Sequence, residues 1–182
     1  GGRTIIPGIN DAQADVDPHR PPHAVPVPDE PTTGQIAAAL AAADKDVAPG
    51  IRLTLQIGAR VWEDAAVTRA WLDERVTARA VTLYEYTGHG AILNSAGLTD
   101  AGIDESIGDP DGGRVVRVAA GRLNGRVEEN AQIIVGRRLA AKVDRAARSE
   151  TYRTFSSDAV RYGITSVHLM ATGLPHAEMI AA

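Results

Sequence analysis

The chain has 182 residues, of which 44% are hydrophobic and 23% are charged, a composition typical of globular proteins and not of disordered ones. A net charge of −4 gives no indication of a basic nucleic-acid-binding face, and the absence of cysteine excludes disulfides, thiolate metal sites and a cysteine nucleophile. No apolar run reaches the ~20 residues of a membrane-spanning helix. We therefore expect neither nucleic acid nor membrane as a partner, and a cytoplasmic location is favoured.

The first half of the chain predicts strands that alternate with helices. Residues 4–9 predict a short apolar strand, and the proline-rich stretch 18–31 predicts an extended loop because proline lacks the N–H that helices and sheets use. Thr32 or Thr33 can cap an alanine-rich helix that ends near Asp46. The patterns that follow predict a strand over 52–58, a helix over 63–76 and a strand over 80–86.

The second half continues the same alternation. A turn at Thr87-Gly88 leads into a short predicted helix over 91–101, which is followed by a predicted strand over 114–118. The patterns after this strand predict a long helix over 126–148, further helical turns over 158–162 and a strand over 164–170. Helices that alternate with strands indicate an α/β fold.

Four segments, taken in chain order, carry a resemblance to a known family. They are 6–12 (IPGINDA), 87–98 (TGHGAILNSAGL) continued by 101–103, the stretch from 109–113 (DPDGG) to Glu129-Asn130-Ala131, and 163–168 (GITSVH). In this order the segments resemble motifs of the metal-dependent amidohydrolase superfamily, in its YtcJ-like branch. The resemblance covers almost the whole chain and is least distinctive over 18–49.

The resemblance implies an α/β chain that forms a partial (β/α)8 barrel, with only the first two barrel strands, carrying an α+β insertion. Residues 1–17 would hold the first barrel strand and the metal motif, 18–49 a proline-rich loop and a helix, 50–148 the insertion, and 149–182 the second barrel strand. A complete barrel takes ~250 residues. We therefore expect an N-terminal part that self-associates, is only marginally stable, or needs a missing C-terminal portion to cover its open strand edges.

The resemblance also implies a divalent metal ion, zinc first, that activates water for attack on a C–N bond. The family places two metal ligands on its first strand as His-x-His, where this chain has Gln13 and Asp15. Glutamine is a poor zinc ligand, whereas Asp15 and the nearby Asp11 supply oxygen ligands. A site here would favour an oxygen-ligated ion, or hold no metal at all.

Three further residues are site candidates through the same resemblance. His89 lies between two glycines, and the corresponding family histidine faces the active-site region, so we expect it to contact a small-molecule substrate; capping of the next helix is the alternative. Glu129 matches a recurrent family glutamate, although Glu128 and Glu129 are equally explained by a helix N-terminus. His168 would end the second barrel strand, either at the barrel mouth or as a structural rim residue.

Two other groups favour structural or solvated roles. Asn94 and Ser95 open a predicted helix, where such side chains usually bond to local backbone. His19 and His23 lie in the proline-rich stretch, which favours a solvated loop over a metal site.

Three functions remain open from the sequence. The leading prediction is a metal-dependent amidohydrolase that hydrolyses a C–N bond of a non-peptide amide, present here as a part inactive alone. The change to Gln13 and Asp15 motivates the alternative, a non-catalytic relative or fragment that acts as a binding or assembly module. The third possibility is an unrelated α/β domain whose likeness to the family is coincidental. In that case residues 4–9 and 163–169 are expected not to be neighbouring parallel strands.

Overall fold

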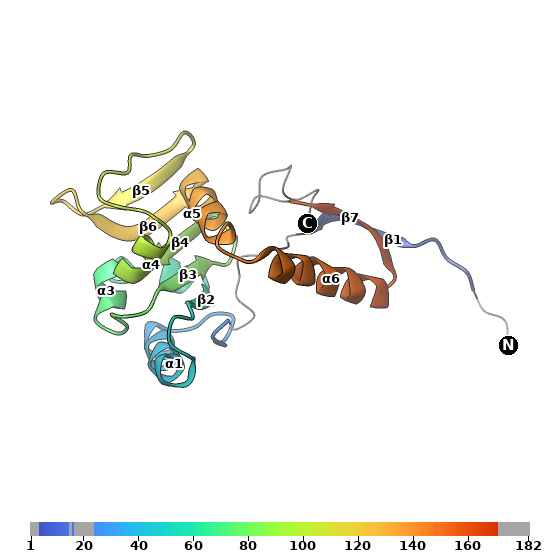
Figure 1. Cartoon of the computed structure of the whole chain (residues 1–182), viewed down its shortest axis with the longest axis horizontal. Helices are drawn as coiled ribbons and strands as arrows, with labels where there is room; N and C mark the ends of the chain where they lie inside the picture. Colours follow the sequence, from blue (N-terminus) through green and yellow to red (C-terminus); the bar gives the residue numbers. More distant parts are fainter. Residues whose placement is uncertain (1–3, 15, 17–23, 171–182) are drawn as a thin grey trace. The chain divides into compact units, whose positions relative to one another are not determined.

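The structure is a computed structural model that describes residues 4–14, 16 and 24–170. The chain divides into two compact units: unit 1 comprises residues 1–19 and 140–182, and unit 2 comprises residues 20–139. Both parallel and antiparallel strand pairs occur in this mixture of helices and strands, which confirms the predicted α/β class (Figure 1). Within the described ranges, no helix is both long and apolar enough to cross a bilayer.

The described part of unit 2 contains one mixed sheet and five helices. Its strands are β2 (Leu53–Ile57), β3 (Val81–Glu85), β4 (Gly90–Leu93), β5 (Gly113–Arg117) and β6 (Leu123–Glu129). Its helices are α1 (Thr33–Asp46), α2 (Ala59–Trp62), α3 (Arg69–Asp73), α4 (Ser95–Asp100) and α5 (Asn130–Ala140), the last of which ends at the unit boundary. The strand order is β2-β3-β4-β6-β5, with β2 and β3 parallel and the other pairs antiparallel.

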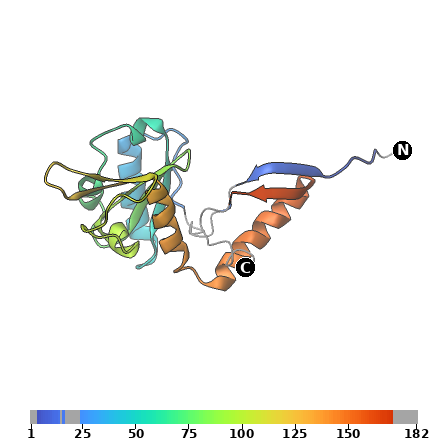
Figure 2. The same cartoon turned by 90° about the horizontal axis from the view of Figure 1, so that it is seen from above.

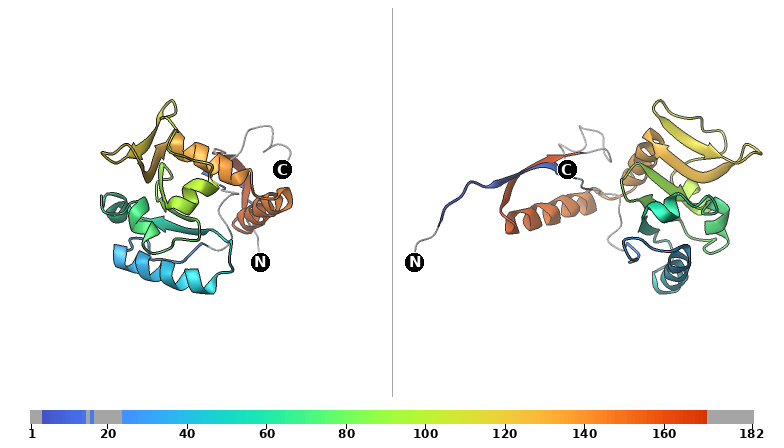
Figure 3. Two further views of the ribbon diagram at one scale, coloured as in Figure 1. Left: turned by 60° about the vertical axis from the view of Figure 1, so that its left-hand side comes forward. Right: turned by 180° about the vertical axis from the view of Figure 1, so that it is seen from behind.

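Two hydrophobic cores cover the two faces of this sheet. On one face, Ile36 and Leu40 of α1 pack with Leu55 of β2 and Leu83 of β3. On the other face, α4 and α5 pack against β4, β5 and β6 (Figure 3). Leu139 is buried in this second core. Every residue of β3 and of the middle strand β4 is buried, and burial of each large aliphatic side chain contributes about 1.5–3 kcal/mol.

The predicted helix after the proline-rich stretch is confirmed as α1. Thr32 is its N-cap, and its hydroxyl accepts a hydrogen bond from the backbone N–H of Gln35 at 3.2 Å. The side chain of Gln35 accepts in return from the backbone N–H of Thr32 at 2.8 Å. This reciprocal capping box satisfies two donors that the helix itself leaves unpaired.

The predicted helix over 63–76 is wrong in its extent, because only the short helix α3 lies within this range, while α2 already ends at Trp62. Between them, the carboxylate of Asp64 accepts from the backbone N–H of Ala66 at 2.9 Å and turns the chain. Thr68 then caps the second helix by accepting from the N–H of Trp71 at 3.3 Å. Local side-chain bonds to the backbone thus interrupt an otherwise helical spacing.

Two further predicted helices are corrected by sheet pairing. The start of the predicted helix 91–101 is β4, which pairs with β3 and β6, and helix begins only at Ser95. The predicted helix 126–148 begins instead as β6, followed by α5 and then by α6 (Arg145–Arg161). Hydrogen bonding between strands distant in sequence decides these segments, which local periodicity does not detect.

Unit 1 consists of β1 (Ile9–Ala14), α6 and β7 (Ile164–Leu169) in its described part. The two strands pair in parallel, and α6 packs against β7 (Figure 2). The predicted strand over 4–9 is wrong in its bounds, since the ladder starts with the N–H of Ile9 donating to the carbonyl of Gly163 at 2.9 Å. Proline at position 7 has no N–H to donate, and the strand forms after it. The predicted strand over 164–170 is confirmed as β7.

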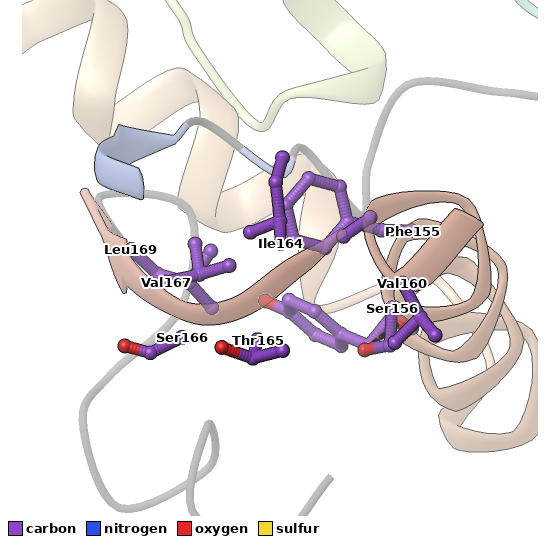
Figure 4. Close-up of a pocket in the computed structure, with 10 residues that line it drawn as sticks. Phe155, Ser156, Val160, Ile164, Thr165, Ser166, Val167 and Leu169 are labelled. Atoms are coloured by element: carbon purple, nitrogen blue, oxygen red, sulfur yellow. Dashed lines mark hydrogen bonds between the residues drawn. The ribbon is translucent and has the colours of Figure 1, made fainter. Parts of the chain in front are cut away.

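Unit 1 leaves much apolar surface uncovered in its described part. No residue of α6 is buried, and Val160 and Tyr162 are 66% and 78% exposed. A shallow hollow of about 210 Å³ between α6 and β7 is lined by side chains such as Phe155, Ile164 and Val167 (Figure 4). Among the described residues, the hydrophobic core is therefore concentrated in unit 2.

We predict that the backbone amides of β1 and β7 exchange with solvent at least about tenfold faster than those of β3 and β4, because few buried contacts oppose local opening of unit 1. Hydrogen–deuterium exchange on the isolated chain measures this difference. Equal protection in both units, in a chain that sizing shows to be monomeric, would contradict the prediction.

Candidate functional site

Unit 2 carries a polar hollow of about 300 Å³ next to the turn between β3 and β4. Its lining residues are Trp62, Glu85, Thr87, His89, Glu128 and Glu129. They come from α2, from the end of β3, from the following turn and from the end of β6. Three carboxylates, an imidazole and an indole are thus brought together from segments up to 67 positions apart in the sequence.

The turn that begins at Glu85 places His89 at the hollow. Glu85 is a buried residue, only 5% exposed. Its carboxylate accepts two hydrogen bonds from Thr87, one from the backbone N–H at 3.0 Å and one from the side-chain hydroxyl. Gly88 donates to the carbonyl of Glu85 at 3.0 Å and has a φ of +82°, a conformation that glycine adopts readily. The side chain of His89 is 67% exposed at the end of this turn.

His89 and Glu129 bind each other twice. The ring atom Nδ1 of His89 lies 2.9 Å from Oε2 of Glu129, and the backbone N–H of Glu129 donates to the carbonyl of His89 at 2.7 Å. Glu129 has a φ of +53°, the one positive φ of a non-glycine residue in the described part of the chain. The hydrogen bond that the ring donates to Glu129 and the charge of Glu129, together with the charge of Glu85, raise the pKa of His89 above its ordinary value despite slight desolvation.

The rest of the lining is held by two arginines. Arg114 forms a bidentate ion pair with Glu128, with an Nε–Oε2 distance of 2.8 Å and an Nη2–Oε1 distance of 3.0 Å. Arg126 lies over the Trp62 ring, 4.1 Å from its centroid, and donates to the Trp62 carbonyl at 2.6 Å. Trp62 in turn packs against Gly90, where a Cβ would lie 2.3 Å from a ring atom, so the glycine is required for this close approach.

Asn94 and Ser95 are structural residues, in agreement with the favoured prediction. The fully buried amide of Asn94 makes four hydrogen bonds, accepting from the N–H groups of Val81 and Gly97 and donating to the carbonyls of Val76 and Arg79, all within 2.9 Å. Ser95 is also bonded: its backbone N–H and its hydroxyl both donate to the carboxylate of Asp73.

The metal candidates on the first strand do not form a site in the described residues. The carboxylate of Asp11 accepts a hydrogen bond from the backbone N–H of Gln13 at 3.1 Å, and Gln13 is exposed. His168 is an exposed residue of β7. Nowhere in the described ranges do three or more histidine, cysteine, aspartate or glutamate side chains gather so that they could hold a metal. Among the described residues, Asp11 and Gln13 alone therefore do not make up a metal site.

Asp15, with His19 and His23, lies outside the described residues. Of the remaining predicted site residues, the structure brings His89 and Glu129 together in unit 2, while Asp11 and His168 belong to unit 1. Sequence reasoning missed Glu85 and Trp62. The position of Glu85, an acidic residue that ends an apolar strand before a Gly-His-Gly turn, was a usable signal, whereas nothing in the sequence associates Trp62 with that turn.

Comparison with known proteins identifies similar sequences and folds. The model of the amidohydrolase family matches residues 1–182. An uncharacterized metal-dependent hydrolase from Pyrococcus horikoshii OT3 superposes with a TM-score of 0.60 at 13% sequence identity, over 96% of this chain and 33% of that one. No match was found among curated proteins.

A second solved structure, an uncharacterized metal-dependent hydrolase from Pyrococcus furiosus, has a TM-score of 0.56 and 17% identity, over 92% of this chain and 33% of that one. At these identities the likeness concerns the fold. The chain spans about a third of the length of the two structures that it resembles.

Replacement of Glu129 by glutamine should lower the pKa of His89 toward its ordinary value, because the substitution removes the charge that favours the imidazolium form. A raised pKa in the folded state means that this pair stabilises the fold fully below the ordinary histidine pKa and stops doing so as the pH rises through the folded-state value. NMR titration of the His89 ring measures the pKa, and chemical denaturation at several pH values measures the stability. The matched control is Glu74→Gln, and an unchanged titration in Glu129→Gln would contradict the assignment.

Asn94→Ala should destabilise the protein by at least about 3 kcal/mol, since it leaves two buried N–H groups and two carbonyls without partners. Chemical denaturation monitored by tryptophan fluorescence measures the loss. Asn130→Ala serves as the control, because the exposed Asn130 amide donates to one carbonyl, that of Asp111, and its removal should cost less than about 1 kcal/mol. A loss below that of the control would contradict the anchoring role of Asn94.

Proposed function

The chain belongs to the amidohydrolase family, and we propose that it supplies the N-terminal part of a metal-dependent hydrolase that cleaves a C–N bond of a non-peptide amide. The observation that carries the proposal is the parallel pair β1 and β7 with α6 packed against it. A strand, a crossover and a parallel neighbouring strand are the repeating unit of a (β/α)8 barrel, whose active site lies at the carboxyl ends of the strands.

In this proposal the crossover from β1 to β7 contains all of unit 2 as an insertion, with α6 as the helix that returns the chain. The apolar side chains that α6 leaves uncovered, among them Val160 and Tyr162, support the proposal, because the next strands and helices of a barrel would bury such a surface. The partner that we propose for unit 1 is therefore the remainder of the barrel.

The catalytic metal is proposed to be zinc, held by residues outside the described part of this chain. Asp11 and Gln13 alone supply too few ligands for zinc, so we assign no step of the hydrolysis to them. His89 and Glu129 of unit 2 are proposed to contact the substrate instead, since His89 is exposed, lines a polar hollow and is oriented by a carboxylate.

A second candidate function is a non-catalytic relative that acts as a binding or assembly module. The favouring observation is the same first strand, where an exposed glutamine replaces a histidine and where the described residues form no metal cluster. Restoration of the family pattern distinguishes the two functions, because a strand that once held a metal should hold it again when its ligands return.

We predict that Gln13→His/Asp15→His binds about one zinc ion per chain, since the resemblance places the two metal-binding histidines of the family at these positions and Asp11 can add an oxygen ligand. Elemental analysis after dialysis against trace zinc measures the content, alongside hydrolysis assays on amides, cyclic amides and carbamates. The control Asn10→His/Ala12→His places the same two residues on the alternate positions of β1 and should bind less. Equal zinc content in both variants would contradict a metal position on this strand and favour the binding module.

A further inference from the structure

One half-buried arginine of β6 has no carboxylate in contact with it among the described residues. The guanidinium of Arg126 lies over the Trp62 ring and donates from Nη2 to the Trp62 carbonyl at 2.6 Å. The other half-buried arginines in the described part of unit 2 each lie 2.5–3.4 Å from a carboxylate oxygen: Arg52, Arg69, Arg75 and Arg79. Because charged side chains that leave water are normally paired, Arg126 is the exception that needs an explanation.

The guanidinium of Arg126 keeps a complete pair of donors for a ligand. An arginine carries N–H donors on Nε and on both Nη atoms, all in one plane. The Trp62 carbonyl accepts from one N–H of Nη2, and no other hydrogen bond of this side chain is found among the described residues. Whichever N–H of Nη2 is used, either the Nε–Nη2 edge or the Nη1–Nη2 edge retains both of its donors. Each of these edges matches the two oxygens of a carboxylate.

The position of Arg126 is fixed through both its backbone and its side chain. Its backbone N–H donates to Oδ1 of Asn124 at 2.8 Å, across Gly125, which has a φ of +95°. Its guanidinium lies 4.1 Å from the centroid of the Trp62 ring, and that ring lies against Gly90 of the neighbouring strand β4. A guanidinium that is held in place before a ligand arrives loses little conformational entropy on binding.

The charges around Arg126 favour a ligand with one negative charge. Arg114, Glu128 and Arg126 lie on one face of the sheet, because Arg114 pairs with Glu128 and Arg126 lies two positions along the same strand. Both oxygens of Glu128 bind Arg114, which leaves the charge of Arg126 without an anion in contact. Burial lowers the pKa of Arg126 despite the opposing charge of Glu128, yet a guanidinium stays protonated at neutral pH. A dianion would add a surplus negative charge near Glu128.

We propose that Arg126, held on the ring of Trp62, is a binding site for the carboxylate group of a small-molecule ligand. The two carboxylate oxygens accept hydrogen bonds from the free edge of the guanidinium. Arg126 does not line the hollow beside the β3–β4 turn. The inference goes beyond the proposed hydrolase function, since it requires neither a metal ion nor hydrolysis.

A second arginine–tryptophan pair of the same chain is a matched internal control. Arg75 lies over the Trp71 ring, 3.7 Å from its centroid, and donates to the Trp71 carbonyl at 2.5 Å. This arrangement repeats that of Arg126 and Trp62, but Arg75 has a carboxylate oxygen of Glu74 at 3.4 Å. Only the pair without a carboxylate, at Trp62, should respond to an added one.

Acetate and acetamide test the site on the intact chain, because they have nearly the same shape and differ in charge. Binding is followed at pH 7 and constant ionic strength by the NMR signals of the two indole N–H groups, which Trp71→Phe assigns. Acetate should shift the Trp62 signal saturably, with a Kd on the order of 10 mM for so small a ligand. The Trp71 signal should not move, and acetamide should shift neither signal.

Three outcomes of this titration would overturn the proposal. Equal shifts of both indoles would indicate a general effect of the added salt. Equal effects of acetate and acetamide would show that the charge of the ligand is not recognised. Tighter binding of inorganic phosphate than of acetate would contradict the assignment of a carboxylate with one negative charge.

Two variants test Arg126 itself. Arg126→Gln removes the charge, and Arg126→Lys keeps the charge but loses the two-donor edge, so both should weaken acetate binding at least about fivefold. The control Arg75→Gln should leave acetate binding unchanged, and urea denaturation establishes that each variant is folded under the conditions of the titration. Unchanged acetate affinity in folded Arg126→Gln would overturn the proposal. The titration of the unmodified chain tests the site even where a variant does not fold.

Discussion

The hydrogen bonds of one buried amide connect the segments on which the hollow of unit 2 depends. The side chain of Asn94 binds Val81, the first residue of β3, and Gly97 in the first turn of α4. It also binds Val76 and Arg79 in the segment that precedes β3. An amide has two donor and two acceptor sites, and here all four are used in the interior, where each unmade bond would be costly. The open end of the β3–β4 pair is thereby fixed.

The other end of the same strand pair carries the turn with His89. Between His89 and Asn94 lie the four residues of β4, which pairs with β3 on one side and with β6 on the other. A displacement of β4 would therefore move His89 away from Glu129 at the end of β6. The sequence motif that contains His89 and Asn94 thus joins a presented side chain to its structural anchor, and this explains why both occur in one short segment.

Much of the fold could be predicted from local sequence, and the site could be predicted only in part. The capping pair Thr32 and Gln35 and the alternating pattern of β3 act within a few residues, so sequence reasoning located α1 and the strand correctly. The segments 91–93 and 126–129 carry apolar and helix-forming residues, and only their pairing with distant strands makes them β4 and β6. The same non-local pairing places Glu129 beside His89.

The positive φ of Glu129 indicates which of its two contacts with His89 requires a glutamate at this position. A positive φ in a residue with a side chain costs of order 1–3 kcal/mol, and glycine would adopt it without that strain. Glycine would keep the N–H that donates to the carbonyl of His89, but it would lose the carboxylate that binds Nδ1. The contact that a glycine cannot replace is therefore the one with the imidazole. The strain at this position is therefore accompanied by a hydrogen bond that fixes the orientation of the His89 ring.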